Sequence, residues 1–328
     1  MKILITGILC FALANVAMAA VDVKPTPAKK ANAIQELDLD TRGELEAWRE
    51  RVGQSLKRDN GWLTLAGRFV MKPGANTFGT GANNDIVFPS ELKGVGSDRL
   101  GVITVDEAAK TVTLTTTEGT SWTADGKPIA NPRVLGTSTD KRDWVALNNI
   151  AMHVIERDGK YILRLADNKS AVRANFKGRL WYQPDAKFRV QAKYTPYPPG
   201  KTIAIVNVLD EVNDEPSPGF VEFKLNGVNY KLDAVGDGEG LFFVMRDKTS
   251  GDTTYRPSRF LSVEKKPEPN KPFWLDFNRA YNPPCAFSEF TTCPLPPKQN
   301  ILRVRIEAGG KIFEDVSRIV IAQTLYFY

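Results

Sequence analysis

Turn-forming residues recur at short intervals along this chain, and this spacing constrains the fold more than any other feature. Asn-Gly, Asp-Gly and Pro-Gly steps separate short runs of apolar and β-branched residues. Such steps supply the backbone conformations that tight hairpins need. The signals are Asn60-Gly61, Lys72-Pro73-Gly74, Asn83-Asn84-Asp85, Asp125-Gly126, Asp158-Gly159, Asn226-Gly227 and Ser250-Gly251. We therefore expect a ladder of β-hairpins.

The runs between these turns predict strands, and no regular alternation of strands with long helices is present. The clearest predicted strands are residues 102–105, 111–117, 161–165, 203–209, 221–225, 241–246 and 260–263. This pattern argues against a doubly wound α/β sheet. The expected fold class is mainly β, with β-sandwich or partly open barrel modules and one N-terminal amphipathic helix.

One segment near the start has helical rather than strand periodicity. Its apolar positions are Leu45, Trp48, Val52 and Leu56. This spacing predicts a helix over 41–57, capped by Asp40 or Thr41. Its apolar face is expected to pack on a β module.

The first residues predict export. Lys2 precedes a short apolar run over 3–16, and Ala17-Met18-Ala19 has small residues at both key cleavage positions. The run is too short to span a membrane, and no later stretch comes close to about 20 apolar residues. We therefore expect a signal peptide, no transmembrane segment, and a soluble periplasmic or secreted protein.

Composition and turn spacing suggest a division of the chain into five parts. These are a signal peptide at 1–19, a flexible leader at 20–40, a helix with an N-terminal β module at 41–148, a C-terminal β module at 149–313, and a terminal extension at 314–328. The net charge of +6 comes from 44 basic and 38 acidic residues spread along the chain. This distribution does not favour nucleic-acid binding.

The chain has a single histidine, His153, within a strand-like stretch at 150–155. Histidine-rich metal sites are therefore excluded. A Ser-His-Asp triad would need His153, but no Gly-x-Ser-x-Gly elbow is present. We expect His153 to be a strand residue with a hydrogen-bonded ring, and we expect no cofactor.

After the signal peptide only two cysteines remain, Cys285 and Cys293. In an oxidising compartment this pair predicts one disulfide that makes its segment rigid. The alternatives are two buried thiols or a reactive cysteine, and the latter lacks the histidine partner that such chemistry normally uses.

The segment around these cysteines is the densest cluster of polar and charged groups. The candidate ligand-binding residues are Asp276, Asn278, Arg279, Tyr281 and Asn282. In this interpretation Arg279 clamps an anionic or polar group, the two amides orient it, Tyr281 stacks, and Asp276 tunes the arginine. The competing interpretation is that these groups pair internally and route an irregular segment over the core.

A second polar cluster contains Asp210, Glu211, Asp214 and Glu215. Four carboxylates this close are a weak candidate for a calcium site. A solvated acidic loop between strands is the simpler interpretation.

Several motifs together resemble the bacterial family catalogued as domain of unknown function 1684. They lie at 60–65, 74–79, 84–87, 215–219 and 276–297. The last block is the most specific, because Phe-Asn-Arg-Ala-Tyr-Asn-Pro-Pro-Cys-Ala-Phe followed by Cys-Pro-Leu-Pro-Pro is not a generic β pattern. The resemblance covers about residues 45–310 and implies no established activity.

Residues 77–89 also resemble the opening strands of forkhead-associated phosphopeptide readers. Those modules carry an arginine directly after the glycine, where this chain has Thr80. The guanidinium that would bind a phosphate is therefore missing, so we expect distant kinship of fold without phosphopeptide binding.

The sequence thus favours a binding or accessory module of the cell envelope over an enzyme. Its partner would be a small polar ligand, a glycan or an envelope protein. The alternative is a carboxylate-dependent hydrolase of envelope or extracellular material. Its catalytic groups would come from Asp276, Glu289, Glu215 or Asp210.

Overall fold

The computed structural model describes residues 33–92 and 97–312, and it confirms a mainly β fold with one long helix at the start. The expected signal peptide, most of the leader and the terminal extension at 314–328 lie outside the described residues. No helix within the described ranges is long and apolar enough to cross a lipid bilayer.

Helix α1 spans Leu39–Lys57 and begins two residues before the predicted start. Its N-cap is Asp38, whose carboxylate accepts hydrogen bonds from the backbone amide and the hydroxyl of Thr41, each at 2.8 Å. Leu45 and Leu56 are buried, as the periodicity predicted. The helix therefore presents the expected apolar face to the β structure.

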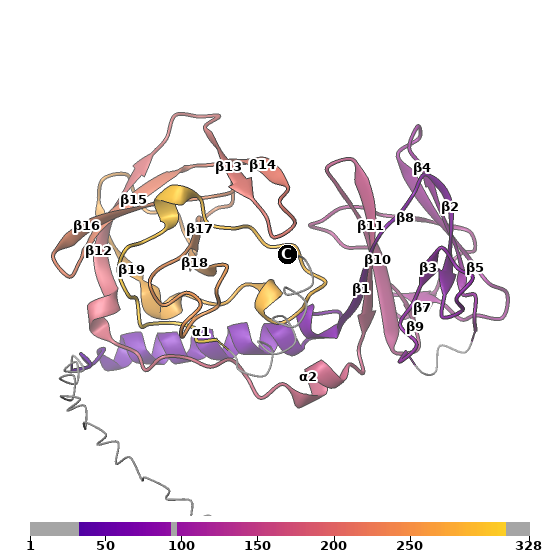
Figure 1. Ribbon diagram of the computed structural model, residues 1–328, viewed down its shortest axis with the longest axis horizontal. Coiled ribbons are helices and arrows are strands. Elements are labelled where there is room, and N and C mark those ends of the chain that lie inside the picture. The colour runs from indigo at the N-terminus through magenta and orange to yellow at the C-terminus, as the bar shows by residue number, and fades with distance from the viewer. Residues whose placement is uncertain (1–32, 93–96, 313–328) are drawn as a thin grey trace, which may run out of the picture. The chain divides into compact units, whose positions relative to one another are not determined.

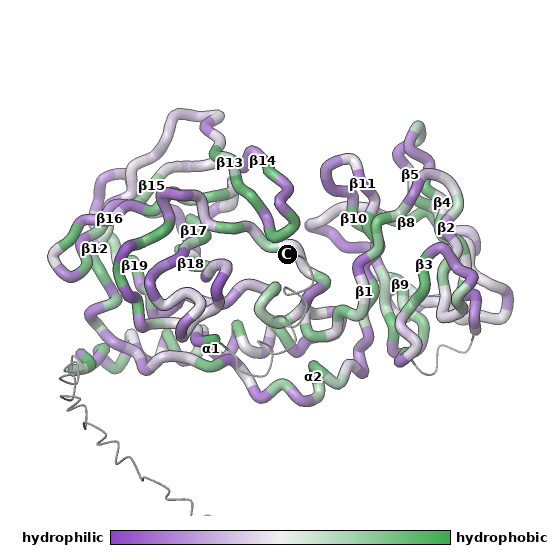
Figure 2. Tube along the Cα trace, viewed as in Figure 1, coloured by the Kyte–Doolittle hydropathy of each residue, from purple (hydrophilic) through white to green (hydrophobic). Residues whose placement is uncertain are grey.

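The strands up to β11 form two sheets around one core (Figure 1). One sheet has the order β1-β11-β10-β9-β6-β7 and the other the order β3-β2-β4-β5-β8, in which only the β2–β3 pair is parallel. The strands are β1 Leu65–Val70, β2 Gly74–Gly79, β3 Ile86–Val87, β4 Gly101–Asp106, β5 Thr111–Thr116, β6 Thr123–Ala124, β7 Lys127–Pro128, β8 Arg133–Leu135, β9 Val145–Leu147, β10 Ile150–Arg157 and β11 Lys160–Asp167. Strand β9 consists only of hydrophobic residues (Figure 2).

The later strands surround a second core. A four-stranded sheet has the order β16-β15-β12-β19, and two hairpins, β13-β14 and β17-β18, accompany it. The strands are β12 Arg189–Pro196, β13 Thr202–Val206, β14 Val212–Pro216, β15 Gly219–Leu225, β16 Val228–Asp233, β17 Leu241–Met245, β18 Arg259–Val263 and β19 Pro272–Asp276. Helix α1 contacts the helical turn over Phe277–Arg279 that follows β19.

Short helical turns connect these strands. They are η1 Trp62–Thr64, α2 Ala171–Asn175, η2 Ala186–Phe188, η3 Phe277–Arg279, η4 Pro284–Ala286 and η5 Lys298–Asn300. The turn dipeptides behave as predicted, because Asp125, Asp158 and Asn226 have φ angles of 48°, 53° and 52° and each precedes a glycine.

The first sheet continues across the expected division at residues 148/149. Strands β9 and β10 flank that point and pair with each other, and the first core includes Val154 and Leu163 from β10 and β11. The second core begins at Phe188, and the described residues from Ile34 onward form one compact unit. A division into domains, and kinship with forkhead-associated modules, stay predictions.

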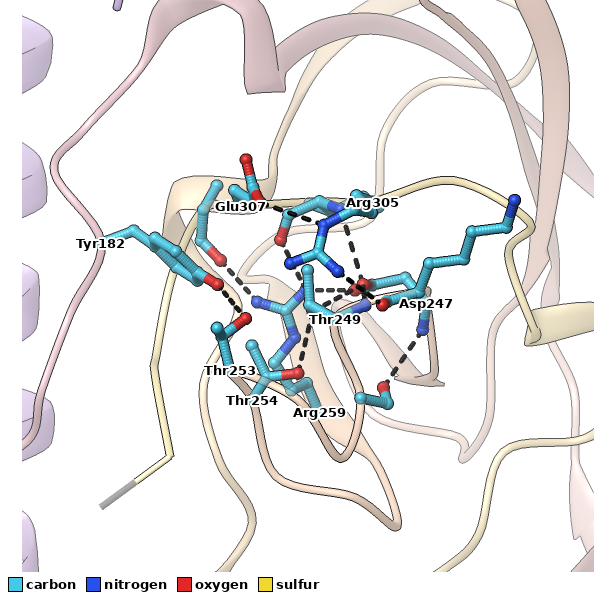
Figure 3. A network of polar contacts seen from close by, with 12 residues as sticks. Tyr182, Asp247, Thr249, Thr253, Thr254, Arg259, Arg305 and Glu307 are labelled. Atoms are coloured by element: carbon cyan, nitrogen blue, oxygen red, sulfur yellow. Dashed lines mark hydrogen bonds and ion pairs between the residues drawn. The ribbon is translucent and has the colours of Figure 1, made fainter. Parts of the chain in front are cut away.

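A buried ion pair organises the loops around β18 (Figure 3). Arg259 is 1% exposed and pairs with Asp247. Its guanidinium also donates to the backbone carbonyls of Ala308 and Ile306, and Asp247 accepts the amide and hydroxyl of Thr249. A carboxylate and several polar groups thus compensate this buried charge.

Candidate functional site

Two of the predicted ligand-binding residues, Asp276 and Asn278, form hydrogen bonds that hold the fold. Asn278 is fully buried, and its side chain makes two 3.0 Å hydrogen bonds with the backbone of Asp185. The same amide donates to the carboxylate of Asp276 at 2.9 Å. Asp276 also caps η3 by accepting the backbone amide of Asn278. These polar groups already have partners within the chain.

Tyr281 and Asn282 are also enclosed by the fold. The Tyr281 ring packs edge-on against Trp48 of α1 and against Phe260, with centroid distances of 6.0 and 5.9 Å. Burial raises the pKa of Tyr281. Asn282 donates to the carbonyl of Lys311 at 2.8 Å, while its Oδ1 is buried without a hydrogen-bond partner in the described part of the chain. Tyr281 thus helps to hold α1.

Arg279 is partly exposed, and its side chain points toward two acidic residues at the surface. Its guanidinium lies 3.6 Å from the carboxylate of Glu44 and 3.9 Å from that of Glu264, both largely exposed. Arg279 and Asp276 line a hollow of about 220 Å³ together with Trp274. Ligand binding by Arg279 stays a prediction.

The acidic cluster does not converge on a metal site. Asp210 occupies a left-handed turn, with a φ angle of 60°, and Glu211 accepts a hydrogen bond from Asn207. Asp214 and Glu215 are neighbours on β14, so their side chains point to opposite faces. In the described ranges, no three His, Cys, Asp or Glu side chains are placed to hold a metal ion.

The predicted disulfide is confirmed. Cys285 and Cys293 are bonded, with their Cα atoms 6.2 Å apart. The segment between them is mostly buried, and the Thr291 hydroxyl lies 3.0 Å from the sulfur of Cys285. The cross-link therefore fixes the position of Thr291.

This cross-linked segment forms one wall of a cavity of about 90 Å³, far more than a single water molecule needs. We call it the arginine pocket. Its polar lining consists of Thr139, Arg142, His153, Arg157, Arg164, Thr291 and Thr292, and Trp62, Ile155, Pro284 and Cys293 complete the wall.

The pairing of β10 with β11 explains why these side chains meet. His153 and Arg157 are at alternate positions of β10, so both side chains leave the same face of the sheet. Arg164 of β11 lies directly opposite His153, and Arg68 of β1 lies opposite Arg164 on the other side. One sheet face thus carries a cross-strand row of Arg68, Arg164 and His153.

The arginines of this pocket have no acidic partner. Among the described residues, no carboxylate forms an ion pair with Arg142, Arg157 or Arg164, although many other cations of the chain have one. Arg164 donates one hydrogen bond, at 3.0 Å, to the carbonyl of Phe290. The guanidinium of Arg142 stacks 5.3 Å from the ring centroid of Trp62.

The electrostatics reflect this excess of positive charge. Burial, followed by the charges of other arginines, lowers the pKa of Arg164 to about 10. Burial and then the charges of Arg142 and Arg164 lower the pKa of His153 to about 3, so its ring is neutral at neutral pH. Within the described residues the His153 Nδ1 atom has no hydrogen-bond partner. His153 is a strand residue as predicted, but the expectation of a fully hydrogen-bonded ring was wrong.

A family model matches part of the second half of the chain. Residues 174–311 match the family described as a protein of unknown function, DUF1684. This chain belongs to the DUF1684 family. The solution NMR structure of an uncharacterized protein from Haloarcula marismortui is similar, with 30% sequence identity, a TM-score of 0.36, and coverage of 42% of this chain and 78% of that one. No curated protein matches the chain.

The DUF1684 match begins well after the predicted resemblance at residue 45. It includes Thr291 and Thr292 of the pocket, whereas Arg142, Arg157 and Arg164 precede it. The pocket of this DUF1684 protein is therefore built from residues before position 174 and from residues within the matched segment.

The chemistry of the pocket suits an oxyanion. Guanidinium groups bind carboxylate, phosphate and sulfate groups through two parallel hydrogen bonds, and threonine hydroxyls can add further donors. Like charges placed opposite one another on a sheet are unfavourable, and a bound anion would relieve their repulsion. No Asp or Glu lines the cavity, so it holds no pair of carboxylates for acid and base catalysis.

Sequence reasoning missed the arginines because they are distributed along the chain. A usable signal was nevertheless present in the Asp158-Gly159 turn. A two-residue hairpin turn at that point sets the strand register and places His153 opposite Arg164. The contributions of Arg142 and Thr291 come from distant segments and needed the tertiary structure.

Proposed function

We propose that this DUF1684 protein is an exported binding protein whose arginine pocket holds a small anion. The observation that carries the proposal is that Arg142, Arg157 and Arg164 line one cavity, and none of them pairs with a carboxylate in the described chain. Arg164 is 7% exposed, and a buried charge without a counter-charge is strongly unfavourable. A bound anion would supply the missing partner.

The size of the cavity supports a compact head group. A volume of about 90 Å³ suits a carboxylate, phosphate or sulfate group rather than a whole nucleotide or sugar chain. On the wall that the disulfide holds, the Thr291 hydroxyl donates to the carbonyl of Ser288 at 2.9 Å, so the hydroxyl available to donate to a ligand is that of Thr292. We therefore propose that the pocket recognises the ligand by its charged group.

Export is the second half of the proposal. It rests on the signal-like pattern at residues 1–19, and the disulfide agrees with an oxidising compartment. An anion-binding protein in the cell envelope would bind a small solute, an anionic glycan or a charged group of another envelope protein.

Binding is favoured here over hydrolysis. The carboxylates available to a hydrolase are Asp276, Glu289, Glu215 and Asp210, and none of them lines the arginine pocket. Arginines and a neutral histidine can hold an anion, but this wall supplies no carboxylate to exchange protons with a substrate.

The test is a thermal-shift and calorimetric titration of the mature protein with sulfate, phosphate and acetate at matched ionic strength. We expect the melting temperature to rise with at least one of these anions, because a ligand of the folded state stabilises it by mass action. Arg142→Gln and Arg157→Gln should each weaken this response at least tenfold in Kd. Arg51→Gln, which removes an exposed charge from α1, is the matched control. An equal response in all four proteins would contradict the proposal.

A further inference from the structure

A second hollow, of about 470 Å³, lies along β1 and the segment after β3. Most of its lining is apolar, and we call it the phenylalanine hollow. It is lined by Phe69, Val87, Phe88, Pro89 and Phe290 and by two charged residues of opposite sign, Arg68 and Glu91, among others. Val87 is 42% exposed, so part of this apolar surface is open to solvent.

This hollow adjoins the arginine pocket through two sets of neighbouring residues. Arg68, which lines the hollow, is the direct cross-strand partner of Arg164, which lines the pocket. Phe290 lines the hollow, and the next residue, Thr291, lines the pocket. The Phe290 carbonyl also accepts the hydrogen bond of Arg164. The two spaces thus adjoin at the edge strand β1, where Arg68 faces the pocket side and Phe69, paired with Leu163, faces the first core.

Charge is distributed along this path. Arg68 forms no ion pair among the described residues, and its Nε atom is buried without a hydrogen-bond partner. Arg68 is therefore a fourth cation, placed between the charged pocket and the apolar hollow. A molecule that lies across both spaces meets positive charge at one end and hydrocarbon at the other.

We propose that the ligand is an amphiphilic anion, a small molecule with a phosphate, sulfate or carboxylate head in the arginine pocket and a hydrocarbon tail in the phenylalanine hollow. This inference rests on the proposed function and adds the chemical class of the ligand. A purely inorganic anion would leave the apolar surface of Val87, Pro89 and Phe290 uncovered. A tail placed there removes that surface from water, which is favourable in proportion to the area buried.

The test compares tails of increasing length on one head group. Methyl, butyl and hexyl phosphate, and in a second series acetate, pentanoate and heptanoate, are titrated into the protein by calorimetry. Full burial of a methylene group strengthens binding about fourfold. In this partly open hollow we expect roughly two- to fourfold tighter binding per added methylene in the series whose head group binds.

Two surface variants locate the tail. Val87→Ser should reduce the ratio of hexyl to methyl phosphate affinity at least threefold while leaving methyl phosphate binding unchanged. Val134→Ser is the matched control, because Val134 is also an exposed strand valine, 63% exposed, in β8 of the same sheet, and it does not line the hollow. Arg164→Gln should abolish binding of short and long ligands alike.

The outcomes separate the two proposals. If the short anions bind in an Arg164-dependent way but affinity does not rise with tail length, this inference is overturned and the proposed function stands. If the gain persists in Val87→Ser, or the long ligands bind Arg164→Gln as tightly as wild type, the placement of the tail is wrong. If methyl phosphate, acetate and sulfate all fail to bind, both proposals fail.

Discussion

Two buried arginines of this protein, Arg259 and Arg164, have opposite surroundings. They are 1% and 7% exposed. Arg259 has the carboxylate of Asp247 and two backbone carbonyls as partners. Arg164 has a single carbonyl, and its charged neighbours are further arginines. Burial alone therefore does not distinguish Arg259 from Arg164, the arginine that we propose to bind an anion, whereas the presence or absence of a counter-charge does.

The largest effect is expected where a buried arginine has a carboxylate as its partner. Asp247→Asn leaves the charge of Arg259 buried without a carboxylate, and we expect a loss of about 3–5 kcal/mol in the free energy of unfolding. Urea denaturation followed by circular dichroism measures this loss. Asp252→Asn is the control, because its ion pair with Arg305 is partly exposed and should contribute less than about 1 kcal/mol. Equal losses of unfolding free energy in both variants would show that burial of the Asp247–Arg259 pair makes no difference.

The disulfide supports the wall of the arginine pocket, and its removal should have the next largest effect. The cysteines are 8 positions apart. The double variant Cys285→Ser with Cys293→Ser should lose about 2–3 kcal/mol, because the unfolded chain regains the freedom of that loop. It should also bind anions more weakly, since Thr291 is no longer held in place. Chemical reduction of the wild type should reproduce both changes. Unchanged anion affinity would show that the disulfide does not support the pocket.

The pocket should make stability depend on pH. The pKa of folded His153 is about 3, below the value of roughly 6.5 in the unfolded chain. Between these values the unfolded chain binds a proton that the folded chain does not. Above pH 6.5 the neutral His153 therefore does not lower the free energy of unfolding. As the pH falls below 6.5, the free energy of unfolding decreases by about 1.4 kcal/mol per pH unit.

His153→Gln removes the group that titrates, so its unfolding free energy should lack this part of the slope between pH 6.5 and 4. Urea denaturation at a series of pH values measures the difference. Arg164→Gln should show a smaller slope than the wild type, because one of the charges that lower the pKa of His153 is gone. Identical slopes in wild type and His153→Gln would show that the histidine is not held neutral.

Arg164→Gln is the counterpart of Asp247→Asn, and we expect it to change the free energy of unfolding in the opposite direction. It removes a desolvated charge that repels its neighbours, while the new amide can still donate to the carbonyl of Phe290. We expect the ligand-free protein to be unchanged or more stable by about 1 kcal/mol. Thermal and urea unfolding in chloride buffer measure this. A loss of several kcal/mol would show that Arg164 is a structural arginine like Arg259.

Arg279→Ala should have the smallest effect. Its ion pairs with Glu44 and Glu264 are long and involve largely exposed carboxylates, so we expect a change below about 0.5 kcal/mol. Sulfate and phosphate should bind as they do to the wild type. If the anion response disappears in this folded variant, the ligand site lies at residues 276–282 and not in the arginine pocket.

The sequence predicted the strands well because their signals are local. Two-residue turns such as Asp158-Gly159 and Asn226-Gly227 set the ends and register of their hairpins, and the disulfide followed from the number of cysteines. The helix start differed by two residues because Asp38, not Asp40 or Thr41, is the cap.

The candidate site was harder to predict, for a physical reason. Polar residues such as Asn278 are dense in the specific block, but backbone groups such as those of Asp185 satisfy them. The property that marks the arginine pocket is that Arg164 has no carboxylate partner among the described residues. The absence of a carboxylate at a given point in space depends on the packing of the whole chain and leaves no local pattern.

The composition of the pocket limits how far ligand binding found in one member of this family can be assigned to another. The cations come from residues ahead of 174, while Pro284, Thr291 and Thr292 lie within the family segment 174–311. A protein that consists of the family segment alone would carry the threonine wall without the arginines. Ligands found for this chain should therefore be transferred only to relatives that also have the preceding sheet, and fragments cut at the family limit are unsuitable for ligand screening.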